Sequence, residues 1–125
     1  MTAGVERRST ILKGVLDVCL LALVDQQVVY GYELARRLGE HGLPVAGGST
    51  YPLLARLERN GWLTSEARPS ETGPVRKYYS LTKAGAQALD EGRQEWATVA
   101  AAVASVLSAP PITEEQPQPE TVKEI

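Results

Sequence analysis

The sequence contains few of the residues from which catalytic and metal centres are built. Its 125 residues include one cysteine, Cys19, and one histidine, His41. A single cysteine excludes a disulfide framework within one chain, and this pair supplies too few ligands for an ordinary zinc site. The sequence also has no Ser/His/Asp arrangement and no glycine-rich loop of the phosphate-binding kind. It therefore predicts no enzyme, no bound metal and no cofactor.

Long hydrophobic runs are absent as well. No stretch of eighteen apolar residues predicts a membrane span, and the first ten residues lack the hydrophobic core and cleavage site of a signal peptide. The composition, with 43% hydrophobic and 22% charged residues, is ordinary for a soluble globular domain. We therefore expect a single cytoplasmic domain with a modest core.

Charge is unevenly distributed along the chain. Residues 1–83 carry 11 basic and 8 acidic side chains, whereas residues 84–125 carry 2 basic and 7 acidic ones. These regional charges of +3 and −5 give the net charge of −2. A basic front half indicates a partner of negative charge on one side of the molecule. The alternative is an ordinary solvated surface without such a partner.

Apolar residues at helical spacing predict three short helices in the first half of the chain. The first is expected to start at a Ser9 cap and to end near Asp25, and the second to cover residues 32–41, with Gly42 as its stop. The third is expected over residues 50–60 and is ended by Gly61. Short helices joined by tight glycine-containing connections are typical of a helix-turn-helix core.

The pattern changes to alternation after the third helix. Residues 62–67 and 75–81 are rich in β-branched and aromatic types, and the turn-forming residues between them predict a hairpin. Alternation directs Tyr79 and Leu81 inward. Thr82 is expected to cap a long helix over residues 83–108, and we expect the Pro-rich, acidic residues 109–125 to form a disordered tail.

These elements, in this order, make a mostly α fold with a small β-hairpin, the plan of a winged helix-turn-helix followed by a long C-terminal dimerisation helix. Five stretches follow one another along these elements, namely "VLDVCLLALV" (15–24), "YGYEL" (30–34), "GSTYPLLARLERNGWL" (48–63), "RKYYSLTKAG" (76–85) and "EW" (95–96). In these stretches the sequence resembles the PadR family of bacterial transcription regulators, in its short subclass. The resemblance implies a homodimeric, ligand-responsive repressor that binds a palindromic operator. The expected division is a DNA-binding domain over residues 9–82, a dimerisation helix over 83–108 and the tail.

Six residues are predicted to contact DNA. The N-terminal residues of a recognition helix reach base edges, and hydroxyl groups and free amides there attract phosphate. Arg56 has the reach for the backbone or a guanine, and the hairpin adds basic residues for phosphate. The predicted contacts are Ser49, Thr50, Tyr51, Arg56, Arg76 and Lys77.

Two of these residues, Ser49 and Tyr51, also have a structural role to be weighed. Ser49 is a good helix cap whatever the helix binds, and we expect it both to cap and to contact phosphate. Tyr51 has the alternative of packing within the domain. Of Arg76 and Lys77, at least one is expected to reach phosphate.

A heptad seam runs along the predicted long helix. Apolar or small residues recur at alternate spacings of three and four, which is the pattern by which two helices pack together. The predicted dimer interface consists of Leu89, Trp96, Val99, Val103 and Val106. A ligand site is predicted at Trp96, Gly92 and Val99, because the resemblance implies that paired tryptophans sandwich flat aromatic compounds there. Trp96 as a plain packing residue is the alternative.

The favoured function is a cytoplasmic, homodimeric DNA-binding repressor that is released from an inverted-repeat operator by a planar aromatic ligand. The acidic residues Asp90, Glu91 and Glu95 favour a cationic or hydroxylated ligand over an anionic one. Two other functions stay open. One is a winged-helix module that binds another protein, and the other is a drug-sequestering protein without operator binding.

Overall fold

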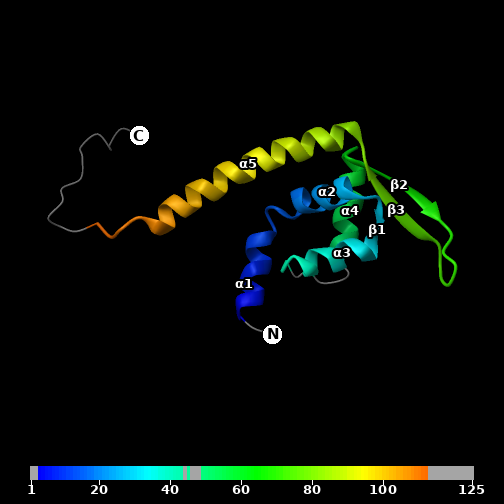
Figure 1. Ribbon diagram of the computed structural model, residues 1–125, viewed down its shortest axis with the longest axis horizontal. Helices are drawn as coiled ribbons and strands as arrows, with labels where there is room; N and C mark the ends of the chain where they lie inside the picture. The colour runs from blue at the N-terminus through cyan, green and yellow to red at the C-terminus, as the bar shows by residue number, and fades with distance from the viewer. Residues whose placement is uncertain (1–2, 44, 46–48, 113–125) are drawn as a thin grey trace.

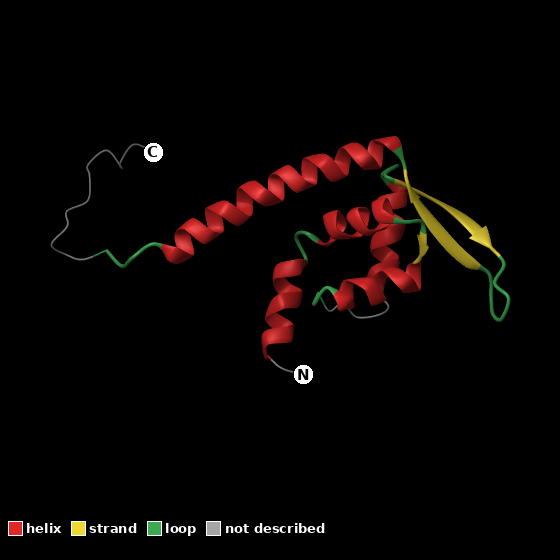
Figure 2. Ribbon diagram, viewed as in Figure 1, coloured by secondary structure: helices red, strands yellow, loops and turns green. Residues whose placement is uncertain are grey.

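The computed structural model describes residues 3–43, 45 and 49–112 of the chain (Figure 1). The structure is mostly helical with one small antiparallel sheet, as the sequence predicts (Figure 2). Most of the predicted tail, from residue 113 onward, lies outside the described residues. The elements are α1 (Ala3–Leu12), α2 (Leu16–Gln26), β1 (Val29–Tyr30), α3 (Gly31–Glu40), α4 (Thr50–Arg59), β2 (Leu63–Arg68), β3 (Arg76–Leu81) and α5 (Lys83–Ser108).

The first predicted helix is wrong in its extent, because the structure divides it into α1 and α2. Ser9 lies inside α1 rather than at a helix cap. Val15 has a non-helical ψ of 4° and a φ of −129°, and its N–H donates to the Leu12 carbonyl at 2.9 Å to close a turn. Gly14 within this turn weakens the helix. Apolar spacing continues on both sides of the break, so periodicity alone does not reveal it.

The helix-turn-helix core consists of α2, α3 and α4. Gly42 and Gly61 follow α3 and α4 with φ angles of 85° and 82°, a conformation that favours glycine, and they confirm the two predicted helix ends. The centre of the core is made of fully buried leucines from the three helices, namely Leu20, Leu21, Leu34, Leu38, Leu54 and Leu57. The three helices therefore share one apolar core.

The predicted hairpin is confirmed, and it forms part of a three-stranded sheet in the order β1-β3-β2. Strand β1, which the sequence did not predict, pairs Val29 with Tyr79, and β2 pairs Ser65 with the same Tyr79. Tyr79 is buried and Leu81 is partly buried, as alternation predicts. We call the hairpin and its turn, residues 63–81, the wing.

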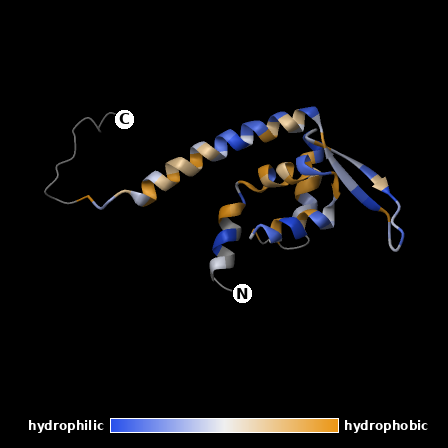
Figure 3. Ribbon diagram, in the orientation of Figure 1, coloured by the Kyte–Doolittle hydropathy of each residue, from blue (hydrophilic) through white to orange (hydrophobic). Residues whose placement is uncertain are grey.

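Helix α5 starts at a firm anchor and then leaves the domain (Figure 1). Its N-terminal cap is Thr82, as predicted, since Thr82 Oγ1 accepts from the Gly85 N–H at 2.9 Å. A Cβ atom at Gly85 would lie only 2.0 Å from the Trp62 carbonyl oxygen, so the first turn of α5 packs directly on the backbone that follows α4. Beyond this anchor the C-terminal half of α5 is rich in hydrophobic residues (Figure 3).

Exposure along α5 corrects the predicted seam. Leu89 is only 2% exposed and belongs to the core of its own chain, so its predicted place at the dimer interface is wrong. Trp96, Val99 and Val103 are 48%, 47% and 50% exposed, and Val106 is 74% exposed. The uncovered apolar strip therefore begins at Trp96. None of the helices in the described part of the chain is long and apolar enough to cross a membrane.

Candidate nucleic-acid interface

A cleft of about 650 Å³ lies between the start of α3, the exposed face of α4 and the wing. Its polar lining is phenolic and basic, and none of the described residues that line it is acidic. A site with this lining favours an anion. The ring-bearing and charged residues in the lining are Tyr30, Tyr32, Tyr51, Tyr79, Arg76 and Lys77.

Tyr51 stands in this cleft on the first turn of α4. Its ring lies against α3, because a Cβ atom built on Gly31 would be 2.7 Å from Tyr51 Cε1. The side chain is nevertheless 48% exposed. The Tyr51 ring therefore packs against Gly31, and part of the side chain remains accessible to a ligand. The sequence had left packing and ligand contact as alternatives for this residue, and the structure is compatible with both.

The two residues that precede Tyr51 do not behave as predicted. Ser49 has helical dihedral angles, with φ −83° and ψ −11°, and its side chain makes no capping hydrogen bond to α4. An N-cap requires an extended backbone, so the predicted cap is wrong, whereas the phosphate contact of this exposed serine stays a prediction. Thr50 is 0% exposed, and the predicted contact between its side chain and DNA is wrong for that reason.

Arg56 occupies the exposed surface of α4 one turn after Pro52. Its Nη2 atom lies 2.8 Å from Asp17 Oδ2 of α2, and half of the arginine side chain remains exposed. Exposed pairs of this kind contribute about 0–1 kcal/mol to stability. A phosphate therefore competes readily with Asp17 for this guanidinium group.

Arg76 and Lys77 point to opposite faces of the wing, since adjacent residues of a strand alternate. On the outer face the Arg76 guanidinium lies 4.5 Å above the centre of the Tyr30 ring, and Arg68 lies 4.6 Å above the ring of Tyr78. On the inner face the Lys77 ammonium lies 3.6 Å from the Glu58 carboxylate of α4. Stacking on the rings orients the two arginines. Arg68 also pairs with Glu66 at 3.3 Å, so Arg76 is the arginine of this face that stacking leaves open to an anion.

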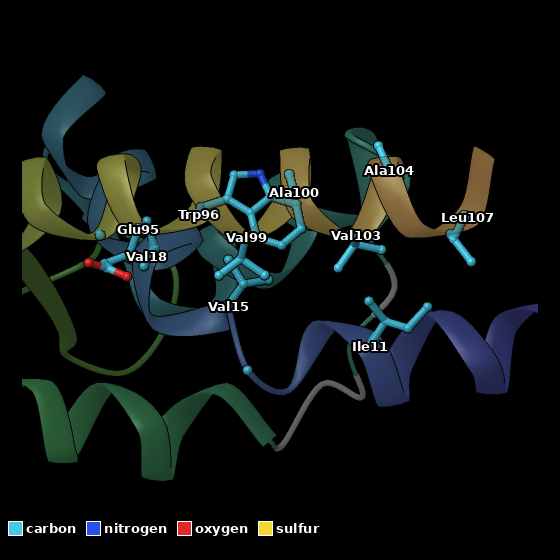
Figure 4. A pocket seen from close by; sticks show the side chains of 12 residues that line it. Ile11, Val15, Val18, Glu95, Trp96, Val99, Ala100, Val103, Ala104 and Leu107 are labelled. Atoms are coloured by element: carbon cyan, nitrogen blue, oxygen red, sulfur yellow. The ribbon is translucent and has the colours of Figure 1, made fainter. Parts of the chain in front are cut away.

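A second concavity, a groove of about 610 Å³, lies between residues 11–18 and α5. Val99 and Val103 of α5 point toward Val15 and Ile11 across this groove (Figure 4). Trp96 and Gly92 also line it, and a Cβ atom at Gly92 would lie 2.7 Å from a Val18 methyl group. All three predicted ligand residues are therefore brought together in one apolar groove.

Among the described residues that line the groove, Glu95 carries the only ionisable side chain. Asp90 and Glu91, which the sequence grouped with it, do not line the groove. One carboxylate at the edge of an apolar surface favours a cationic or hydroxylated aromatic compound over an anionic one.

Comparison with known proteins identifies the family. The model of the transcriptional regulator PadR-like family matches residues 20–91, which is more than half of the chain. The chain belongs to the PadR-like family. Family and fold are therefore those of DNA-binding transcription regulators rather than of enzymes.

Individual relatives of this PadR-like chain agree with the family match. A transcriptional regulator of Mycobacterium tuberculosis is 44% identical over 66 residues, which cover 53% of this chain and 61% of that protein. The crystal structure of a PadR-like transcriptional regulator from Bacillus cereus superimposes with a TM-score of 0.73 and 41% identity, over 82% of this chain and 100% of that one. A PadR family regulator from Eggerthella lenta gives a TM-score of 0.74 at 32% identity, over 81% and 88% of the two chains.

Sequence reasoning missed three residues that lie in or beside the cleft of this PadR-like chain. Tyr30 and Tyr32 stack with their ring centres 6.4 Å apart, and Arg68 completes the outer face of the wing. The signal for the tyrosines was present in "YGYEL", where two aromatic residues flank a glycine at a helix start. Their approach to the wing required strand β1, which was too short to be predicted.

Cys19 is the single cysteine of this PadR-like chain. Burial raises the pKa of this thiol, which disfavours the reactive thiolate at neutral pH. No group of three or more His, Cys, Asp or Glu residues that could hold a metal ion occurs within the described ranges.

Proposed function

We propose that this PadR-like regulator is a homodimeric repressor that binds an inverted-repeat operator and is released by a planar aromatic ligand. The observation that carries the proposal is the cleft between α3, α4 and the wing, whose described lining presents tyrosines and cations and no carboxylate. In this proposal residues 9–82 form the DNA-binding domain and residues 83–108 form the dimerisation helix.

On the DNA side, the exposed face of α4 enters the major groove and the wing follows the backbone. Tyr51 offers a hydroxyl group at the tip of α4, and Arg56 reaches beyond it. Arg76 and Lys77 neutralise phosphates from the two faces of the wing. Phosphate contacts fix the position of the protein, while base contacts from α4 supply sequence preference.

The dimer is formed through the uncovered strip of α5. Trp96, Val99, Val103 and Val106 make a continuous apolar surface on a helix that leaves its own domain, and an exposed patch of this kind normally marks an interface. A second copy carries the same strip and is self-complementary about a two-fold axis. Two recognition helices then face DNA about 34–36 Å apart, one turn of the double helix.

The ligand enters the groove beside Trp96. An aromatic ring stacked on the indole gains about 0.5–1.5 kcal/mol beyond its buried area, and Glu95 selects for positive charge. Release of DNA requires that the ligand binds more tightly to a dimer whose recognition helices no longer match the operator spacing.

The test begins with selection of duplexes from a random-sequence pool by the intact protein. We expect an inverted repeat to be recovered, and Lys77→Ala to weaken binding to this repeat and to a scrambled duplex alike, as measured by fluorescence anisotropy. Lys83→Ala, which removes an exposed lysine at the base of the wing, is the matched control and should bind as wild type. Recovery of no preferred sequence would favour the protein-interaction alternative.

A further inference from the structure

One carboxylate at the end of α4 contacts both strands of the wing. Glu58 Oε2 accepts a hydrogen bond of 2.6 Å from Ser65 Oγ of β2. Glu58 Oε1 lies 3.6 Å from Lys77 Nζ of β3. The glutamate side chain is 32% exposed, so these contacts are partly shielded from water. Glu58 therefore joins the helix and the wing through two separate interactions.

The strand register explains why these partners face the helix. Ser65 is paired with Tyr79 and Ala67 with Lys77 across the β2–β3 ladder, and residues directly opposite each other lie on the same face of a sheet. Tyr79 is 4% exposed and part of the core. Its phenol pKa is raised mainly by burial and then by the negative charge of Glu58. Glu58 thus lies where the apolar core ends and the polar part of the wing begins.

The outer face of the wing is organised differently. There Arg68 stacks on Tyr78 and Arg76 on Tyr30, all within the sheet. These contacts lie within the sheet and do not join it to α4. On the inner face, by contrast, Glu58 contacts the wing from α4.

We propose that Glu58 is a positioning residue for operator recognition, which fixes the wing relative to α4 so that both contact the same half-site together. The inference rests on the proposed DNA-binding function and adds a residue that does not itself contact DNA. Simultaneous contact is needed for sequence-specific binding. Non-specific binding depends on the number of neutralised phosphates and tolerates a displaced wing.

A simpler role for Glu58 makes the opposite prediction. If the carboxylate only neutralises Lys77, its removal frees a lysine for phosphate and strengthens binding to every duplex. Glu66 provides the matched control for this role, because it is an exposed β2 carboxylate paired with Arg68 at 3.3 Å. Glu66→Gln also removes one negative charge near the basic residues of the wing, but it breaks no contact between the wing and α4.

The experiment compares Glu58→Gln, Glu58→Ala, Ser65→Ala and Glu66→Gln in the full chain. Each is titrated with the duplex selected by the wild type and with a scrambled duplex of the same composition. Loss of a hydrogen bond to a charged group corresponds to about a tenfold effect, so we expect Glu58→Ala to lower affinity for the selected duplex about tenfold. Ser65→Ala should also lower affinity for the selected duplex, although it changes no charge. Glu58→Gln keeps an oxygen that can accept from Ser65, so its affinity should lie between that of these two variants and that of the wild type.

Affinity for the scrambled duplex decides between positioning and charge. We expect this affinity to be unchanged or raised in the Glu58 variants. In Glu66→Gln we expect affinity to be raised equally for both duplexes.

If Glu58→Gln and Glu58→Ala strengthen binding to both duplexes as Glu66→Gln does, the positioning role is overturned while the proposed function stands. If Ser65→Ala prefers the selected duplex over the scrambled one as strongly as the wild type does, the hydrogen bond between Glu58 and Ser65 does not contribute to sequence preference. If the wild type selects no sequence, the proposed function and this inference fail together.

Discussion

Gly31→Ala tests whether the position of the Tyr51 ring against α3 matters for DNA binding. The new Cβ atom would lie 2.7 Å from Tyr51 Cε1 and 3.4 Å from Cδ1, distances at which the ring has to move. Tyr51 is 48% exposed, so its ring can swing outward without disturbing the core. Because Gly31 does not have a positive φ, alanine is tolerated by the backbone, and the free energy of unfolding should change by less than about 1 kcal/mol.

The expected effect on DNA is larger than the effect on stability. A displaced Tyr51 loses a hydrogen bond of about 0.5–1.5 kcal/mol per half-site, so affinity for the selected duplex should fall by roughly twofold to tenfold for each half-site. Gly39→Ala is the matched control, since it lies in the same helix with no heavy atom within 4 Å of its added Cβ. It should leave DNA affinity unchanged.

A double-mutant cycle measured by fluorescence anisotropy completes this test. In a Tyr51→Ala background the Gly31→Ala substitution has no ring to displace, and we expect its effect on DNA affinity to vanish. If Gly31→Ala weakens binding by the same factor with and without Tyr51, the substitution acts through the backbone of α3 and the reasoning about the ring is refuted.

Three further outcomes are expected. Val99→Glu combined with Val103→Glu should give monomers in sedimentation velocity that no longer bind the selected duplex, and a dimeric variant would count against the α5 strip. Operator affinity should fall steeply with salt, because neutralised phosphates release counterions. Lys77→Ala should make the slope of log K against log salt shallower by about 0.9 for each phosphate that is no longer neutralised. An unchanged slope would show that Lys77 does not reach phosphate. Cys19 has a pKa raised by burial, so alkylation by iodoacetamide at pH 8 should be slower than for a free peptide thiol, and should accelerate in denaturant.

Local signals were sufficient to predict most of the fold. Gly42, Gly61 and Thr82 end or begin helices through interactions within a few residues, and such interactions are visible in sequence. Tyr79 was correctly directed inward because alternation is fixed by the pleat of the strand.

The errors have a common physical origin in tertiary contacts. Leu89 fits the heptad seam and the core equally well, because a helix that leaves a domain presents the same apolar spacing to two different neighbours. The burial of Thr50 depends on how α4 packs on the rest of the domain, which local sequence does not show. The cleft itself required β1, a two-residue strand whose pairing partner lies about fifty residues away in sequence.

The anchor of α5 has a mechanical consequence. Thr82 Oγ1 donates to the Gly61 carbonyl at 2.6 Å, and Gly85 packs on Trp62, so the end of α4 and the start of α5 share one rigid pivot. From Gly85 to Ser108 the helix reaches about 35 Å, and a tilt of about 10° there carries its far end by roughly 6 Å. If α4 turned with α5 as one body, its tip, about 15 Å from the pivot, would move by only about 2.6 Å. A wide displacement of the apolar end of α5 would then correspond to a much smaller displacement at the tip of α4. Such a rotation would have to carry the core contacts of Leu89 and Gly92 with it.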